Sequence, residues 1–159
     1  MRIKGIVEED FVNYKKVSMY ISIGTCDWKC CIEGGFDKSV CQNQQIAKIP
    51  DQIVENDTLI KTYLENPISE AIVIGGLEPF TYYDDLYEFI ETFRKYSNDD
   101  IVIYTGYNKD EIIDNIKELS KFENIILKFG RFQLNNMKHF DNILGVELVS
   151  DNQYAEKIS

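Results

Sequence analysis

The stretch from Ala71 to Phe93 reads AIVIGGLEPFTYYDDLYEFIETF, an apolar run that leads through a glycine pair into an amphipathic segment. The run Ala71 to Ile74 is short and apolar and ends at Gly75, which is typical of a strand buried on both faces. Thr81 and Asp84 then have the spacing of a capping box and predict the start of a helix. The helix would present one apolar stripe, made of Tyr82, Leu86, Phe89, Ile90 and Phe93. A buried strand followed by a helix predicts an α/β fold with a parallel sheet.

The same alternation of short apolar runs and amphipathic segments continues on both sides of this stretch. Four further runs predict strands: Val17 to Ile23, Ile101 to Tyr104, Ile125 to Leu127 and Leu144 to Leu148. Helices are predicted over 57–65 and over 109–120, and Asn108 with Glu111 caps the second of them. No internal repeat or linker divides the chain, so we expect one α/β domain over residues 1–159.

The composition is acidic, with 17 basic and 27 acidic residues and a net charge of −10. That balance argues against a general nucleic-acid-binding protein, whose affinity would come from Lys and Arg on phosphates. No apolar run approaches the roughly 20 residues that span a bilayer, and Met1 to Asp10 lacks the apolar region of a signal peptide. We therefore expect a cytoplasmic protein with no membrane partner, in conditions that keep its thiols reduced.

All four cysteines lie in one segment, TCDWKCCIEGGFDKSVCQN over 25–43, directly after the first of the predicted parallel strands. Loops at the carboxyl ends of parallel strands carry the active sites of α/β proteins. Thiolates select zinc, copper(I) or iron–sulfur clusters. Neighbouring side chains of an extended segment point to opposite sides, so Cys30 and Cys31 are not expected to hold the same ion. The expected count is therefore three thiolate ligands and one spare thiol, with Cys30 and Cys31 as alternatives for one ligand position.

A structural zinc site is the alternative for this segment, although the two matched C-x₂₋₄-C pairs of such sites are absent. A four-thiolate site mainly transfers electrons or holds the fold together. An iron–sulfur cluster on three cysteines leaves one iron open to a substrate or cofactor. The number of cysteine ligands therefore separates a structural site from a catalytic one.

The cysteine segment resembles the motif of the radical S-adenosylmethionine (SAM) superfamily, and within it the activating proteins of anaerobic (class III) ribonucleotide reductase. That motif is C-x₃-C-x₂-C followed by an aromatic residue and Asn. Cys26-x₃-Cys30 matches its first half, and Cys41-Gln42-Asn43 resembles its end. Further resemblances follow in the family's order: Asp10 to Asn13, Gly75-Gly76-Leu77-Glu78-Pro79 (GGEP), Ile103 to Tyr107 (YTGY), Gly130-Arg131-Phe132 (GRF) and Ser150 to Gln153 (SxNQ).

The chain departs from the family pattern at four places. Ten residues separate Cys30 from Cys41 where the family has two, so the third ligand arrives on an expanded loop. Gln42 stands in place of the aromatic residue, and Leu77 is inserted within the GGEP element. Tyr14 to Lys16 stand where the family has a glycine-rich turn.

The resemblance implies a partial TIM-like barrel of parallel strands with outer helices, the radical SAM core. It implies a [4Fe–4S] cluster on Cys26, Cys30 and Cys41, with SAM at the open iron. SAM contacts are implied for Gln42, Gly75, Gly76, Glu78 and Thr105. The implied activity is that of an activase that generates a glycyl radical on a large partner enzyme, an anaerobic ribonucleotide reductase, with electrons from a low-potential donor such as flavodoxin.

Several alternatives stay open from the sequence. The chain could be a radical SAM enzyme acting on a small molecule or peptide, or a non-catalytic adaptor that keeps an iron–sulfur cluster or zinc. Gly75-Gly76 could only join a strand to a helix, and Glu78 could be a solvated surface charge. The turn at Tyr104 to Gly106 could be purely structural.

Overall fold

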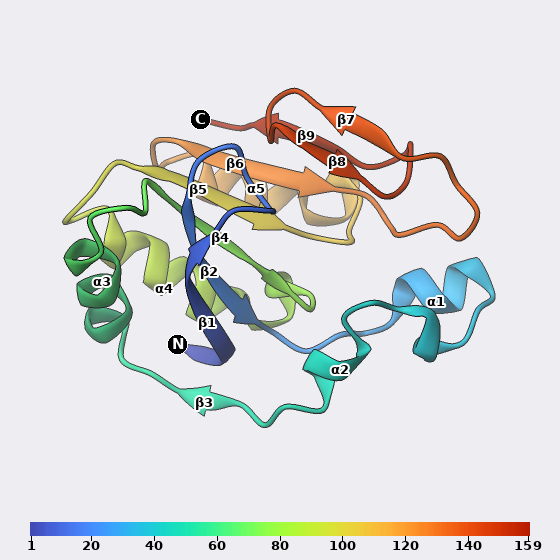
Figure 1. Cartoon of the computed structure of the whole chain (residues 1–159), viewed down its shortest axis with the longest axis horizontal. Helices are drawn as coiled ribbons and strands as arrows, with labels where there is room; N and C mark the ends of the chain where they lie inside the picture. The colour runs from blue at the N-terminus through green and yellow to red at the C-terminus, as the bar shows by residue number, and fades with distance from the viewer.

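The computed structural model describes all 159 residues and is built around a seven-stranded sheet of order β3-β1-β2-β4-β5-β6-β9 (Figure 1). Its strands are β1 (Arg2–Asp10), β2 (Ser18–Ile23), β3 (Gln52–Ile53), β4 (Ala71–Gly76), β5 (Asp100–Tyr104), β6 (Ile125–Phe129) and β9 (Tyr154–Lys157). Strands β2, β4, β5 and β6 are parallel neighbours, while β1, β3 and β9 pair antiparallel. The α/β class with a mostly parallel central sheet is thereby confirmed.

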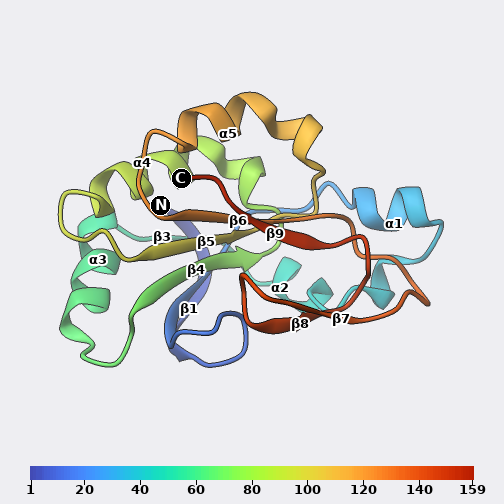
Figure 2. The ribbon, with the colours of Figure 1, turned by 90° about the horizontal axis from the view of Figure 1, so that it is seen from above.

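Three helices connect the parallel strands: α3 (Asn56–Glu65), α4 (Tyr83–Phe93) and α5 (Ile113–Leu119). Figure 2 shows α4 and α5 on one side of the sheet and the hairpin of β7 (His139–Asp141) and β8 (Val146–Leu148) on the other. Short elements fill the connections: α1 (Lys29–Gly34), α2 (Gln44–Ala47) and the 3₁₀ turns η1 (Lys38–Val40), η2 (Pro79–Tyr82) and η3 (Lys109–Ile112). No helix in the structure combines the length and the apolar character needed to cross a membrane.

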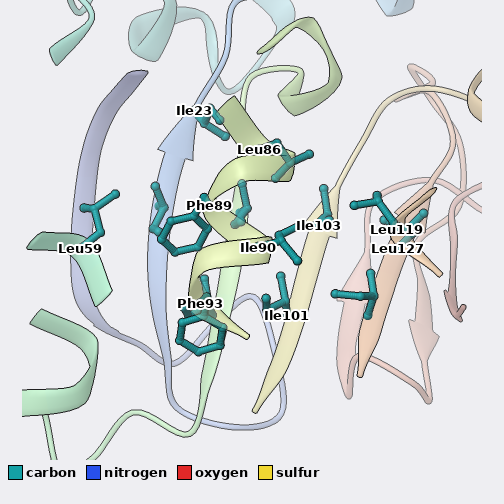
Figure 3. Close-up of a cluster of buried hydrophobic side chains, with 14 of the residues drawn as sticks. Ile23, Leu59, Leu86, Phe89, Ile90, Phe93, Ile101, Ile103, Leu119 and Leu127 are labelled. Atoms are coloured by element: carbon teal, nitrogen blue, oxygen red, sulfur yellow. The ribbon is translucent and has the colours of Figure 1, made fainter. Parts of the chain in front are cut away.

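The main core lies between the sheet and these helices. Alternate residues of the parallel strands point into it, and the predicted stripe of α4 meets them, as the close-up in Figure 3 shows. The fully buried members include Ile23, Leu86, Phe89, Ile90, Phe93, Ile101, Ile103 and Leu127. A second, smaller core on the other face explains why the strands are apolar throughout; it contains Tyr14, Ala71, Val73, Val102, Ile126, Leu144 and Leu148.

One predicted strand, Leu144 to Leu148, is not a member of the parallel sheet. Only Val146–Leu148 are extended, and they pair antiparallel with β7 in a separate two-stranded sheet. Leu144 and Leu148 are apolar because they cover the face of the central sheet that the helices leave open. The sequence pattern predicts that these residues are buried, but it does not predict which sheet the strand joins.

The two predicted helix starts have different outcomes. The capping box at Asn108 is present, with its backbone N–H donating to Glu111 Oε2 at 2.8 Å, but it begins the 3₁₀ turn η3, and α5 follows only from Ile113. The capping box at Thr81 and Asp84 is wrong, because α4 begins only after the turn η2. The Thr81 hydroxyl instead donates to the Glu78 carbonyl at 2.7 Å. Thr81 therefore fixes the turn that carries Glu78 and does not cap the helix.

Candidate functional site

A cavity of about 330 Å³ lies at the carboxyl ends of the parallel strands. Its lining includes Gly76 from β4, Tyr104 from β5 and Lys128 from β6, together with residues of the turns that follow these strands. The segment after β2 supplies three thiols to the same cavity, those of Cys26, Cys30 and Cys41. This is the edge of the sheet at which open α/β folds bind their ligands.

The fourth cysteine lies elsewhere. Cys31 is buried, at 5% exposure, and does not line the cavity. Only Cys30 of this neighbouring pair lines the cavity, as predicted. The predicted reason, an extended segment, is wrong, because both residues lie in helix α1. The structure thus divides the cysteines into three at the cavity and one away from it. No group of three or more His, Cys, Asp or Glu side chains is arranged to hold a metal ion.

The thiols at the cavity lie in a partly buried setting that disfavours the thiolate. Burial raises the pKa of Cys26 to about 11, although the Trp28 N–H donates to Cys26 Sγ at 3.3 Å. Burial also raises the pKa of Cys30, against the opposing effects of the Phe132 N–H and the positive charge of Arg131. Metals and clusters bind thiolates, so binding here would release protons.

Glu78 is a buried carboxylate in the cavity wall, with 4% exposure. It accepts three hydrogen bonds: from the Thr105 hydroxyl at 2.8 Å, the Gly106 N–H at 2.9 Å and the Phe80 N–H at 3.2 Å. Burial raises the pKa of Glu78 to about 7, although all three donors act to lower it. A solvated surface charge, the alternative interpretation of Glu78, is therefore wrong.

Lys128 is a cavity residue that the sequence analysis missed. Its side chain is buried, and its ammonium donates to the Gly130 carbonyl at 3.1 Å. Burial lowers the pKa of Lys128 to about 8, while the charge of Glu78 acts to raise it. The available signal was a single lysine inside the apolar run IILKF. Gln153 also lines the cavity, and its buried Oε1 has no hydrogen-bond partner.

The remaining predicted residues surround the same cavity. Gln42, Gly76 and Thr105 line it, and Gln42 is exposed. Gly75 lies behind the wall, where a Cβ would come within 3.2 Å of the Tyr20 hydroxyl. Gly76 has φ +92°, and a Cβ there would lie 2.3 Å from Ser22 Oγ, so only glycine fits. The glycine pair thus has a steric role beyond ending a strand.

Comparison with known proteins agrees with the thiol-lined cavity. Residues 15–153 match the family model described as a 4Fe-4S single cluster domain. The match includes the parallel strands, the cysteine segment and Gln153. No curated protein and no solved structure matches the chain. Because the family model covers most of the sequence, the chain belongs to the 4Fe-4S single cluster domain family.

Proposed function

We propose that the protein is a radical SAM activase that generates a glycyl radical on a partner enzyme, an anaerobic ribonucleotide reductase. The observation that carries this proposal is the division of the cysteines: Cys26, Cys30 and Cys41 line one cavity, and Cys31 is buried and does not line it. Three thiolates would hold a [4Fe–4S] cluster with one iron open to SAM. A cluster held by Cys26, Cys30 and Cys41 would supply one electron, taken from a low-potential donor, for the cleavage of SAM to methionine and a 5′-deoxyadenosyl radical, and this radical would take a hydrogen atom from the partner's glycine.

The charged residues of the cavity fit the amino-acid end of SAM. Glu78 would accept hydrogen bonds from the ligand's ammonium group, a charge-assisted contact. Its carboxylate is already oriented by Thr105, Gly106 and Phe80. Binding of the ligand would therefore cost little conformational entropy of the Glu78 side chain. Lys128 would bind the ligand's carboxylate. Opposite charges in one buried cavity favour a zwitterionic ligand over a purely apolar or anionic one.

The glycines of the wall support the same assignment. Gly76 lines the cavity without a side chain, so a ligand can approach the backbone closely. A Cβ on Gly106 would lie 3.3 Å from Cys30 Sγ, so this glycine leaves the surroundings of that thiol open. Gln42 at the rim would contact SAM in the place of the family's aromatic residue.

The wider features of the chain fit an activase of a protein substrate. The mostly parallel sheet with helices on one side is compatible with a shortened radical SAM barrel. A large partner enzyme would complete the site. A net charge of −10 suits a partner with a basic docking face, in the cytoplasm, with a flavodoxin-type electron donor.

The test is anaerobic quantitation of iron and sulfide after reconstitution of four single variants, Cys26→Ala, Cys30→Ala, Cys31→Ala and Cys41→Ala. We expect about four iron and four sulfide per chain for the wild type and for Cys31→Ala, and little for the other three. One zinc per chain and no sulfide would contradict the proposal and favour a structural adaptor. A reconstituted cluster that cleaves no SAM under reduction would exclude the activase.

A further inference from the structure

We infer that Arg131 and Phe132 are positioning residues that hold the expanded loop between Cys30 and Cys41 on the domain, and so place the third thiol at the cavity. The inference rests on the proposed three-cysteine cluster site. It joins the expanded loop to the segment Gly130 to Phe132, which also lines the cavity. The structure places these features against each other although about 100 residues separate them in the chain.

The expanded loop has little burial of its own. Between 32 and 40 every residue is exposed except Phe36, which is partly buried. Helix α1 has only six residues, too few for a helix that is stable in isolation. Contacts with the rest of the domain must therefore fix where this loop, and Cys41 at its end, is held.

Arg131 supplies the first of these contacts. Its Nε donates to Glu33 Oε2 at 2.9 Å and its Nη2 to Glu33 Oε1 at 3.0 Å, a two-bond pair with the loop. The guanidinium is also fixed independently of the loop, because it donates to the Gly106 carbonyl at 2.6 Å and to Glu111 Oε1 at 2.7 Å. The Arg131 side chain is 7% exposed, whereas that of Glu33 is 55% exposed. Arg131 is thus a rigid anchor to which the exposed Glu33 attaches.

Phe132 supplies the second contact. Its ring packs edge-on against Phe36, with 5.8 Å between the ring centroids. The Phe132 backbone N–H acts to lower the pKa of Cys30, at the point where the loop begins. Residues 131 and 132 therefore contact the loop at Glu33 and Phe36, and both affect the pKa of Cys30, a proposed cluster ligand.

Two further contacts, made by Lys29 and Lys38, help to hold the loop near Arg131. Lys29 donates to Glu111 Oε1 at 3.1 Å, so the start of α1 and Arg131 share one carboxylate. The Lys38 ammonium lies 5.0 Å from the centre of the Trp28 ring and connects the second half of the loop to the segment that precedes Cys30. An ordered loop pays less conformational entropy when Cys41 binds a cluster, so loss of the anchor should weaken cluster retention without unfolding the domain.

The test is hydrogen–deuterium exchange on the full-length, metal-free protein under anaerobic conditions. The Gly35 and Phe36 N–H groups donate to the carbonyls of Ile32 and Cys31 within the loop, and the Ile32 N–H donates to the Trp28 carbonyl just before it, so exchange of these three groups reports opening of the loop. We expect Arg131→Gln and Glu33→Gln to raise their exchange by about fivefold, the scale of a partly exposed ion pair. Arg131→Lys, which keeps the charge but not the two-bond geometry, should give a smaller increase.

Arg2→Gln is the matched control. Arg2 makes the same kind of two-bond contact with Asp85, at 2.9 and 3.1 Å, and does not line the cavity. The Arg2→Gln variant should leave hydrogen–deuterium exchange in the loop unchanged. If Arg131→Gln does not fold, Glu33→Gln still carries the test, because Glu33 is on the exposed side of the pair.

A second readout is the rate at which a chelator removes iron from the reconstituted protein. We expect Glu33→Gln and Arg131→Gln to lose iron several-fold faster than the wild type and Arg2→Gln. Unchanged exchange and unchanged iron loss in both variants would overturn the inference. Faster exchange in the loop of a protein that cleaves no SAM would leave the anchor standing and contradict only the proposed function.

Discussion

The Thr105 hydroxyl donates a 2.8 Å hydrogen bond to Glu78 Oε1 inside the cavity, which joins the turn after β5 to the turn after β4. The same Thr105 Oγ1 accepts the N–H of Tyr107 at 2.9 Å. The hydroxyl therefore orients the buried carboxylate and its own turn together. A threonine in this turn has a structural and an electrostatic role at once.

Thr105→Val should raise the pKa of Glu78 above its value of about 7, because a donor that favours the charged form is lost. The variant should also lower the free energy of unfolding by about 1–3 kcal/mol, since a buried hydrogen bond to an ionisable group is removed. Carboxyl NMR titration and urea unfolding of the metal-free protein measure the two effects. Thr105→Ser, which keeps the hydroxyl, should stay near the wild type, and an unchanged pKa in Thr105→Val would contradict this account.

The buried carboxylate predicts an unusual pH dependence of stability. The pKa of Glu78 is raised from 4.5 to about 7 in the folded state, so the folded protein binds more protons than the unfolded one between these values. The contribution of Glu78 to stability is thus greatest at low pH and falls as the pH rises from about 4.5 to 7, by up to about 3 kcal/mol.

Glu78→Gln removes this titration while it keeps a similar shape. The difference in unfolding free energy between the wild type and Glu78→Gln should therefore change with pH in that window and level off above it. Urea unfolding of the metal-free proteins at a series of pH values measures this difference. A difference that does not vary between pH 5 and 7 would show that the Glu78 carboxyl titrates normally.

Lys128→Met should weaken SAM binding to the reconstituted protein by about tenfold to a hundredfold, because a charge-assisted contact to the ligand carboxylate is lost. Stability should not fall, since burial disfavours the charged ammonium and lowers the pKa of Lys128 to about 8. Equilibrium dialysis with labelled SAM measures the affinity. Lys109→Met, at a surface ion pair with Glu156, is the control, and equal affinities of the two variants would remove Lys128 from the site.

Gly76→Ala should destabilise the domain by about 1–3 kcal/mol, because φ at this residue is +92° and the added Cβ would lie 2.3 Å from Ser22 Oγ. Gly5→Ala is the control, since a Cβ at Gly5 meets no atom within 4 Å. Urea unfolding compares the two variants. Equal stabilities would mean that the backbone at Gly76 adjusts without cost.

Much of the fold could be predicted because local patterns determine it. The run Ala71 to Ile74 and the apolar stripe of α4 are both explained by burial against one core. The pattern failed where the environment is not local. The antiparallel strands β1 and β9 were not predicted, because they mix polar and apolar residues as partly exposed strands do. The run Leu144 to Leu148 shows that an apolar sequence does not specify which sheet it joins.

The candidate site shows the same difference between residues that the sequence identifies and residues whose role depends on distant partners. The three cavity thiols, Glu78 and Thr105 could be selected from the sequence, because they lie in segments that resemble the motifs of the radical SAM superfamily. Lys128 and Arg131 could not, because their importance depends on burial and on distant partners. The pairing of Arg131 with Glu33 joins residues 98 positions apart, and no local pattern predicts it.

The most direct test of the central claim is the amount of 5′-deoxyadenosine formed when the reconstituted protein is reduced anaerobically with SAM. The account predicts product from the wild type and from Cys31→Ala, whose thiol lies away from the cavity. It predicts none from Cys41→Ala, which lacks the third thiol. Absence of 5′-deoxyadenosine from a wild-type protein with a complete cluster would contradict the account, as would full activity of Cys41→Ala.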